Sequence, residues 1–451
     1  MESVKENTND FSKGSIIGNM ARLAIPMTLA QIINVLYNIV DRIYIGRIGE
    51  HSASAFTGLG VCLPIISFIM AFANLIGMGG AALFSLERGA KHNEEAAYIQ
   101  SNAFAMLIIT GIVLTFVGYA AKEPVLYMLG ASKDTFAYAD SYISIYLVGS
   151  VFVLLSLGLN NFINAQGFGK IGMMTVSIGA FINIALDPVF IFKMGMGVKG
   201  AAFATIISQF VSACWTMQFL IGKKSVIAIE KRYMKLKFER VKKILSLGFA
   251  NFIMLMTNSM VQVMYNAGLQ NYGGDLYVGI MTIINSVREV VQMPVNGISQ
   301  SAQPIMGFNY GAKEFKRTKK TIRYNSIILA VYTGLMWLTI VLFPKFFLRM
   351  FTRDQQVIKY GITALHIYFF GFVFMALQFS GQSVFSALGM AKKAIFFSIF
   401  RKVIIVIPLI YILPMIGNLG TSGIFMSEPI SNLVGGGLCF AVMYFTVYRK
   451  L

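Results

Sequence analysis

Charged residues are scarce in this chain. Only 13% of its 451 residues are Asp, Glu, Lys or Arg, whereas 56% are hydrophobic. A soluble domain carries about 25% charged residues, and the mean hydropathy of this chain is +0.68. This composition excludes a soluble globular domain and predicts a polytopic membrane protein.

Cysteine and histidine are also rare, with three of each. The cysteines all fall inside predicted membrane spans, and no cysteine or histidine has another at ligand spacing. The sequence therefore predicts neither a disulfide framework nor a zinc or haem centre. It also lacks a Ser/His pair and an HExxH-type motif, which argues against a membrane-embedded protease or acyltransferase. The residues concerned are Cys62, Cys214, Cys439, His51, His92 and His366.

Long apolar runs, by contrast, fill most of the chain. A helix needs about 20 predominantly apolar residues to cross the hydrocarbon core of a bilayer, and backbone in lipid must satisfy its own hydrogen bonds. The predicted fold class is therefore an all-α polytopic membrane protein with about twelve transmembrane helices. The spans are expected near residues 17–45, 55–83, 97–120, 136–165, 171–192, 200–222, 246–271, 277–308, 321–343, 357–388, 394–416 and 421–447.

The formal charge of +19 is distributed unevenly along the chain. Basic residues gather in alternate loops, in runs such as Lys223 to Lys243, Lys313 to Arg323 and Lys392 to Lys402. By the positive-inside rule, this pattern places both termini in the cytoplasm. The charge thus reports topology, with contacts to lipid headgroups as a second role, and nucleic acid is not an expected partner. The polar N-terminus has no small-residue cleavage site, so no removable signal peptide is expected.

The two halves of the sequence repeat one another at an offset of about 222 residues. Gly89-Ala90-Lys91 matches Gly311-Ala312-Lys313, and Asn74 matches Asn296. Each half holds six spans, so both enter the membrane in the same orientation, as in a parallel repeat about an axis along the membrane normal. The predicted parts are an N-lobe over residues 1–222, a basic amphipathic cytoplasmic linker over 223–245 and a C-lobe over 246–451. Two six-helix lobes around a central cavity suit transport by alternating access.

The first predicted span carries a carboxylate, Asp41, well inside its apolar sequence. An ionised Asp near mid-bilayer costs about 2.5–3.5 kcal/mol. Polar residues precede it at intervals of three or four and lie on the same helical stripe: Gln31, Asn34 and Asn38. A stripe of this kind must face other protein or a water-filled cavity.

A second carboxylate, Asp187, follows Asn183 by one helical turn in the fifth predicted span. The topology brings Tyr142 and Thr205 to the same outer half of the N-lobe as both acids. Two carboxylates with hydroxyl and amide partners predict a site for a proton or a sodium ion, and a buried network that only fixes helix packing is the alternative. Asn160 lies about 27 Å along its helix from Tyr142, which favours a relay or packing role for it.

The predicted C-lobe has no acid in its first span, where Gln262 and Tyr265 stand in place of Asn38 and Asp41. It carries instead a methionine stripe that includes Met260. Flexible thioethers suit a surface that accepts many ligand shapes, although ordinary packing gives the same pattern. The residues expected to line the substrate cavity are Asn34, Tyr37, Met260, Gln262, Gln292 and Met293.

Several motifs together resemble the multidrug and toxic compound extrusion (MATE) family. They are the early Pro26, the stretch VDRIYIGRIG, the motif NIALDP, the pattern PVNGISQSAQPIMGFNYGAK and the paired GAK loops, and they cover essentially the whole chain. Because the N-lobe acids are present, the chain is most similar to the DinF-type branch. That resemblance implies that Pro26 permits bending of the first helix. It also implies that a cation-responsive network is formed by Asp41, Asn183, Asp187, Thr205, Tyr142 and Asn160.

The expected function is a cation-coupled antiporter, driven by H⁺ or Na⁺, that exports lipophilic cationic compounds, with antibiotic resistance as the consequence. We expect a multi-pass monomer in a prokaryotic plasma membrane, with no enzymatic activity and no cofactor beyond the coupling ion. The alternative is a flippase or exporter of lipid-linked or polysaccharide substrates from the same superfamily. The only arginines that we place inside the spans are Arg42 and Arg288, which disfavours an anionic headgroup as the substrate.

Overall fold

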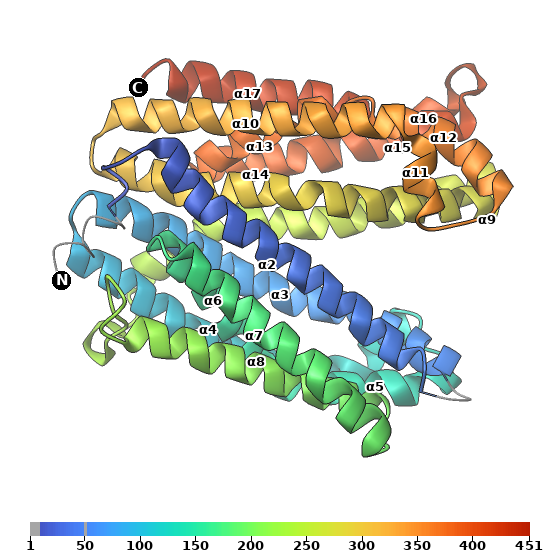
Figure 1. Ribbon diagram of the computed structural model, residues 1–451, viewed down its shortest axis with the longest axis horizontal. Coiled ribbons are helices and arrows are strands. Elements are labelled where there is room, and N and C mark those ends of the chain that lie inside the picture. The colour runs from blue at the N-terminus through green and yellow to red at the C-terminus, as the bar shows by residue number, and fades with distance from the viewer. Residues whose placement is uncertain (1–9, 49–51) are drawn as a thin grey trace. The chain divides into compact units, whose positions relative to one another are not determined.

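The computed structural model describes residues 10–48 and 52–451. Within these ranges the chain is helical and contains no β-strand (Figure 1). Ten of the described helices are long and apolar enough to cross a membrane, and one bent pair adds another span. One of the ten runs for 74 residues and is divided in two by non-helical backbone at Gly274, where φ is 65°. The predicted all-α fold with about twelve spans is confirmed.

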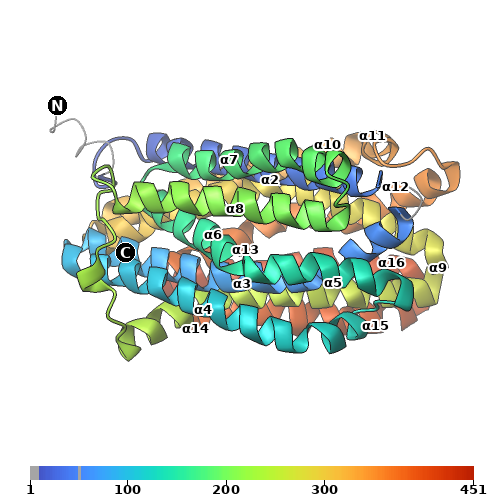
Figure 2. The same ribbon diagram turned by 90° about the horizontal axis from the view of Figure 1, so that it is seen from below.

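The chain divides into two compact units. Unit 1 contains Asp10 and residues 29–248, and unit 2 contains residues 11–28 and 249–451. Figure 2 shows that the long helices within each unit run roughly parallel to one another. Apart from its part of the first helix and the beginning of α9, unit 1 consists of α3 (Ser52–Gly89), α4 (Asn93–Met128), α5 (Lys133–Val148), α6 (Ser150–Ala165), α7 (Gly169–Pro188), the π turn η1 (Val189–Lys193) and α8 (Val198–Ile221).

The main part of unit 2 begins within α9 (Phe238–Gly311). Several of its later helices are interrupted by π and 3₁₀ turns. Helices α10, α13 and α17 pack side by side in it. Its remaining elements are α10 (Phe315–Leu342), α11 (Pro344–Arg349), α12 (Gln355–Phe369), α13 (Phe372–Ala387), α14 (Ala391–Ile399), η3 (Phe400–Val406), α15 (Ile407–Ile412), η4 (Leu413–Asn418), α16 (Gly420–Ser431), η5 (Asn432–Gly436), α17 (Gly437–Met443) and η6 (Tyr444–Tyr448).

The first helix, α2 (Ile16–Ile45), belongs to both units and contains Pro26. Its residues up to 28 group with unit 2, where Ile16 and Leu23 join a buried cluster with Ile305. The segment just before α2 is tied to the same unit, because Asn309 Nδ2 donates to the backbone oxygen of Phe11 at 3.1 Å. Residues 11–28 thus pack with the second half of the chain, and the division into lobes at 1–222, 223–245 and 246–451 stays a prediction.

The connection between the two halves is held on unit 1. Between α8 and α9 it is irregular apart from a short 3₁₀ turn, Lys231–Tyr233. The side-chain oxygen of Gln166 accepts from the backbone N–H of Val226 at 2.7 Å, and Gln100 donates to the carbonyl of Ile227 at 2.9 Å. At the start of α9, Arg240 forms two hydrogen bonds to Glu95, at 2.6 and 2.7 Å. Hydrogen bonds from side chains of unit 1 to the linker and to the start of α9 therefore fix the path of the basic linker.

The beginning of α9 approaches α3 at backbone distance. A Cβ atom added to Gly248 would lie 1.7 Å from the carbonyl oxygen of Leu75, and one added to Gly79 would lie 2.2 Å from the carbonyl oxygen of Ile244. Small residues at such a contact let two membrane helices pack closely. The glycines are therefore required by the contact between these two helices.

Replacing Gly248 by alanine is expected to destabilise unit 1 by about 1–3 kcal/mol, the usual cost of overpacking. The matched control is Gly60→Ala in α3, where an added Cβ meets nothing within 4 Å. Denaturant unfolding can be followed through Trp215 of α8 in a Trp337→Phe background, because the chain has only two tryptophans. Equal stability of the two glycine variants would contradict this account of the helix contact.

Candidate functional site

A buried polar cluster in unit 1 joins the end of α2 to the end of α7. Asp41 is 8% exposed and Asp187 is 0% exposed, and the carboxyl group of Asp187 lies within hydrogen-bonding reach of Asp41. Asn183, one turn before Asp187 on α7, donates through Nδ2 to Asp187 Oδ1 and to Thr205 Oγ1, both at 3.4 Å. The helical spacing and the topology predicted this meeting of α2, α7 and α8, and the structure brings these residues together.

Tyrosine side chains complete the surroundings of the two acids. Tyr142 of α5 is buried beside Asp41 and within hydrogen-bonding reach of Thr205. Tyr37, one turn before Asp41 on α2, lies close enough to both carboxylates to interact with them electrostatically. The cluster thus contains five of the six residues predicted for the cation network.

Buried oxygen atoms in this cluster are available as ligands for a cation. Oδ2 of Asp187 and Oδ1 of Asn183 are buried and accept no hydrogen bond from any residue in the described ranges. Two neighbouring carboxylates repel each other strongly where the dielectric constant is low, and a cation bound between them relieves that repulsion. Carboxylate, amide and hydroxyl oxygens are hard ligands, so the arrangement suits a proton or a sodium ion.

Asn160, the sixth predicted network residue, lies in a different contact. Its Nδ2 donates to the carbonyl oxygen of Gly172 at 3.2 Å, which ties α6 to the first turn of α7. A Cβ added to Gly172 would lie 2.4 Å from Asn164 Oδ1 and 3.1 Å from Asn160 Oδ1, so the helices are close at this point. This contact lies outside the acid cluster, and whether Asn160 acts as a relay or as a packing residue stays a prediction.

A small polar cavity in unit 1 is lined by Asn34 and Tyr37, two of the predicted cavity residues. Its volume of about 30 Å³ holds one or two waters, whereas sites for drug-sized ligands measure about 300–1,000 Å³. Tyr37 thus belongs both to the lining of this cavity and to the surroundings of the carboxylate pair. Its other lining residues are Ser156, Leu157, Thr175, Val176, Gly179, Ala180, Ser208, Gln209 and Ser212.

The predicted cavity residues of the second half have different environments from one another. Met260 is 48% exposed, whereas Met293 is buried. Gln262 and Gln292 are half-buried, and Gln262 donates to Asn266 Oδ1 at 3.1 Å. Their role as a substrate wall stays a prediction.

Sequence reasoning missed a second buried charged cluster, in unit 2. Arg401 and Lys402 were grouped with the cytoplasmic basic run from Lys392, but both are buried inside the candidate span Ala391–Asn418 and paired with Glu428. The prediction that only Arg42 and Arg288 lie within spans is therefore wrong, and Arg22 of α2 and Arg323 of α10 also lie within spans. The sequence did contain a sign of their burial, because apolar residues flank this Arg-Lys pair on both sides. A solvated loop would not have such apolar flanks.

Comparison with known proteins agrees with the fold. The sequence profile of the MatE family matches residues 26–189 and 250–412. The multidrug export protein MepA of Staphylococcus haemolyticus is 25% identical over 438 residues, which are 96% of this chain and 94% of that protein. MepA of Staphylococcus saprophyticus is 23% identical over 435 residues, covering 96% and 95% of the two chains.

Solved structures of transporters share the same fold. An outward-facing multidrug resistance MATE family transporter superposes with a TM-score of 0.91 at 23% identity, covering 98% of this chain and 99% of its own. A MOP superfamily transporter from Pyrococcus furiosus gives a TM-score of 0.91 at 24% identity with the same coverage. The family profile matches more than half of the sequence, in one stretch from each half. This multi-pass membrane protein belongs to the MATE family of transporters, which are not enzymes.

Proposed function

We propose that this protein exports lipophilic cationic compounds from the cytoplasm in exchange for H⁺ or Na⁺. The observation that carries the proposal is the pair of buried carboxylates, Asp41 and Asp187, joined by Asn183 to Thr205. Intramembrane acids are costly and are by default functional. Export of drugs is further supported by the relatives named as multidrug export proteins.

The mechanism couples occupancy of the acid pair to a change of state. A cation that enters from outside binds at Asp41 and Asp187 and removes the repulsion between them. The ion stabilises whichever conformational state, inward-facing or outward-facing, binds it more tightly. Only this difference in affinity can shift the populations of the two states. α2 carries Asp41 and, toward its N-terminus, Pro26, a residue that removes a helical hydrogen bond. Bending of α2 at Pro26 would then favour release of the substrate on the outer side.

The remaining parts of the proposal concern placement and subfamily. We assign the protein to the DinF-type branch and to a prokaryotic plasma membrane, as a monomer with both termini in the cytoplasm. The basic loops that support this orientation include the linker run from Lys223 to Lys243.

Export of a lipid-linked or polysaccharide substrate is a second candidate function. It is favoured by one observation, the grouping of three basic side chains in unit 2, the buried Arg401 and Lys402 and the half-buried Arg288. Such groups suit an anionic headgroup, although Glu428 already pairs with two of them.

Export of ethidium from loaded proteoliposomes tests the proposed function. A proton gradient and a sodium gradient are applied separately, and one of them alone is expected to drive export by the wild-type protein. Empty liposomes under the same gradients are the control. If neither gradient drives export of ethidium, while a fluorescent lipid-linked sugar is translocated, the flippase function replaces the antiporter.

A further inference from the structure

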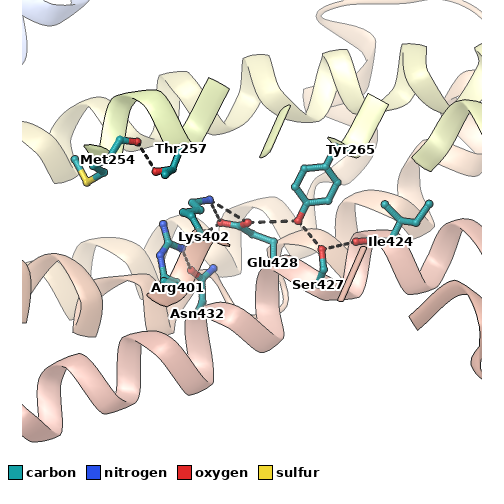
Figure 3. A network of polar contacts seen from close by, with 9 residues as sticks. All are labelled: Met254, Thr257, Tyr265, Arg401, Lys402, Ile424, Ser427, Glu428 and Asn432. Atoms are coloured by element: carbon teal, nitrogen blue, oxygen red, sulfur yellow. Dashed lines mark hydrogen bonds and ion pairs between the residues drawn. The ribbon is translucent and has the colours of Figure 1, made fainter. Parts of the chain in front are cut away.

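The charged cluster of unit 2 joins side chains of α9, η3, α16 and η5 (Figure 3). Glu428 of α16 accepts from Lys402 Nζ at 3.0 and 3.2 Å through its two oxygens, and from Arg401 Nη1 at 3.2 Å. The Tyr265 hydroxyl donates to Glu428 Oε2 at 3.4 Å and is 2.6 Å from Ser427 Oγ. Every acceptor site of this carboxylate that faces the cluster is therefore occupied by side chains of the protein.

The local backbone brings two adjacent basic residues to the same point. Neighbouring residues of a regular α-helix point in directions about 100° apart, so they do not normally share a partner. Arg401 and Lys402 lie in the π turn η3, and Asn432, which accepts from Arg401 Nη1, opens another π turn, η5. π turns are rare and often occur at functional sites.

Lys402 lies about 17 Å from the start of α14, at roughly 1.5 Å per residue, and therefore near the middle of its span. At this depth uncompensated charge is strongly unfavourable. Three basic side chains, Arg288, Arg401 and Lys402, interact electrostatically with Glu428. Glu289, the next residue along α9, is exposed at the surface. The buried cluster thus has more basic groups than its one internal carboxylate balances.

Two groups at the edge of the cluster are left for a ligand. Arg288 of α9 and Tyr368 of α12 lie near each other. Arg288 Nε and the Tyr368 hydroxyl are buried and have no partner at full hydrogen-bond geometry within 10–48 or 52–451, although the hydroxyl lies within hydrogen-bonding reach of the Arg288 side chain. Tyr368 is only 3% exposed, whereas Arg288 is half-buried. A guanidinium with a neighbouring hydroxyl is a good pair of hydrogen-bond donors for a carboxylate.

We propose that Arg288 and Tyr368 bind the carboxylate of an exported substrate, with Arg401, Lys402 and Glu428 as the fixed charges behind them. The carboxylate supplies the missing negative charge and accepts from the guanidinium and the hydroxyl. This inference rests on the proposed export function and names the two side chains that would recognise the carboxylate of a zwitterionic substrate.

Rhodamine B and its ethyl ester test this site, because they differ only in whether the carboxylate is free or esterified. Binding of each dye to the purified full-length protein in detergent is measured by fluorescence anisotropy. Wild type is expected to bind both dyes. Arg288→Gln and Tyr368→Phe are each expected to weaken binding of rhodamine B by about tenfold, in line with the loss of a charge-assisted hydrogen bond, and to leave binding of the ester unchanged.

The matched control is Arg353→Gln, an exposed arginine in the loop before α12, which should alter neither affinity. Arg288→Lys keeps the charge and should recover part of the binding, which separates ligand recognition from misfolding. An unchanged ratio of the two affinities in both variants would overturn the proposed site, as would a wild-type protein that binds the ester but not rhodamine B. Failure of wild type to bind either dye would instead count against the export function on which the inference rests.

Discussion

Replacing Asp187 by asparagine is expected to abolish gradient-driven export of ethidium while leaving the protein folded. The amide has nearly the same shape and can still contact Asn183, but it cannot carry the charge that a cation neutralises. The free energy that couples two binding sites is typically about 1–3 kcal/mol, or roughly 5- to 150-fold in affinity. Without coupling between the cation and the substrate, the gradient cannot drive export, and transport should fall to the level of passive leak. Transport into proteoliposomes under the gradient that drives the wild type is the measurement.

The control for this prediction is Asp134→Asn. Asp134 lies in the first turn of α5 in the same unit and is exposed. The Asp134→Asn variant loses the same charge at a position outside the buried cluster, so its rate of export should remain near that of the wild type. Asp41→Asn should behave like Asp187→Asn, since each acid lies beside the other. Normal coupled export by both buried-acid variants would exclude the acid pair as the coupling site.

The fold was largely predictable because the bilayer imposes a simple length rule on apolar helices. The span expected at 17–45 is observed as α2, Ile16–Ile45, and the pair expected at 246–271 and 277–308 meets at Gly274. Local interruptions were not predictable in the same way. The span expected at 136–165 bends by 57° between α5 and α6, where an added Cβ on Gly149 would lie 2.2 Å from Ile206 of α8. Such bends depend on a neighbouring helix, which periodicity along one chain does not reveal.

The acid cluster of unit 1 was accessible to sequence reasoning because its members are sparse polar residues in apolar spans. Asp41, Asn183 and Asp187 lie on defined helical faces, and the alternation of spans brings those faces to the same depth. The basic cluster of unit 2 was missed because Arg401 and Lys402 follow several lysines, and the whole run was interpreted as a topology signal. Only the three-dimensional pairing with Glu428 separates these two residues from that run.

Replacing Glu428 by glutamine is expected to lower the free energy of unfolding of unit 2 by about 3–5 kcal/mol. Removing one member of a buried ion pair leaves the partner charge without compensation, and that is the usual cost. Here Lys402 loses both of its carboxylate contacts, while Arg401 retains Asn432. Unfolding can be followed in detergent through Trp337 of α10, in a Trp215→Phe background that makes it the only tryptophan of the chain.

The double variant Lys402→Met with Glu428→Gln separates the charge effect from a loss of shape. It removes Lys402, the cation that loses both of its contacts, together with the carboxylate, while Arg401 keeps Asn432. The double variant should therefore recover part of the stability that the single variant loses, because an apolar replacement of a buried pair is often nearly neutral. The difference between the double variant and the sum of the two single variants measures their interaction, which should reach about 0.5–3 kcal/mol. Strictly additive losses would mean that Glu428 stabilises unit 2 through packing with Tyr265 and Ser427. In that case an excess of buried positive charge could not be the reason why a substrate carboxylate binds beside the cluster.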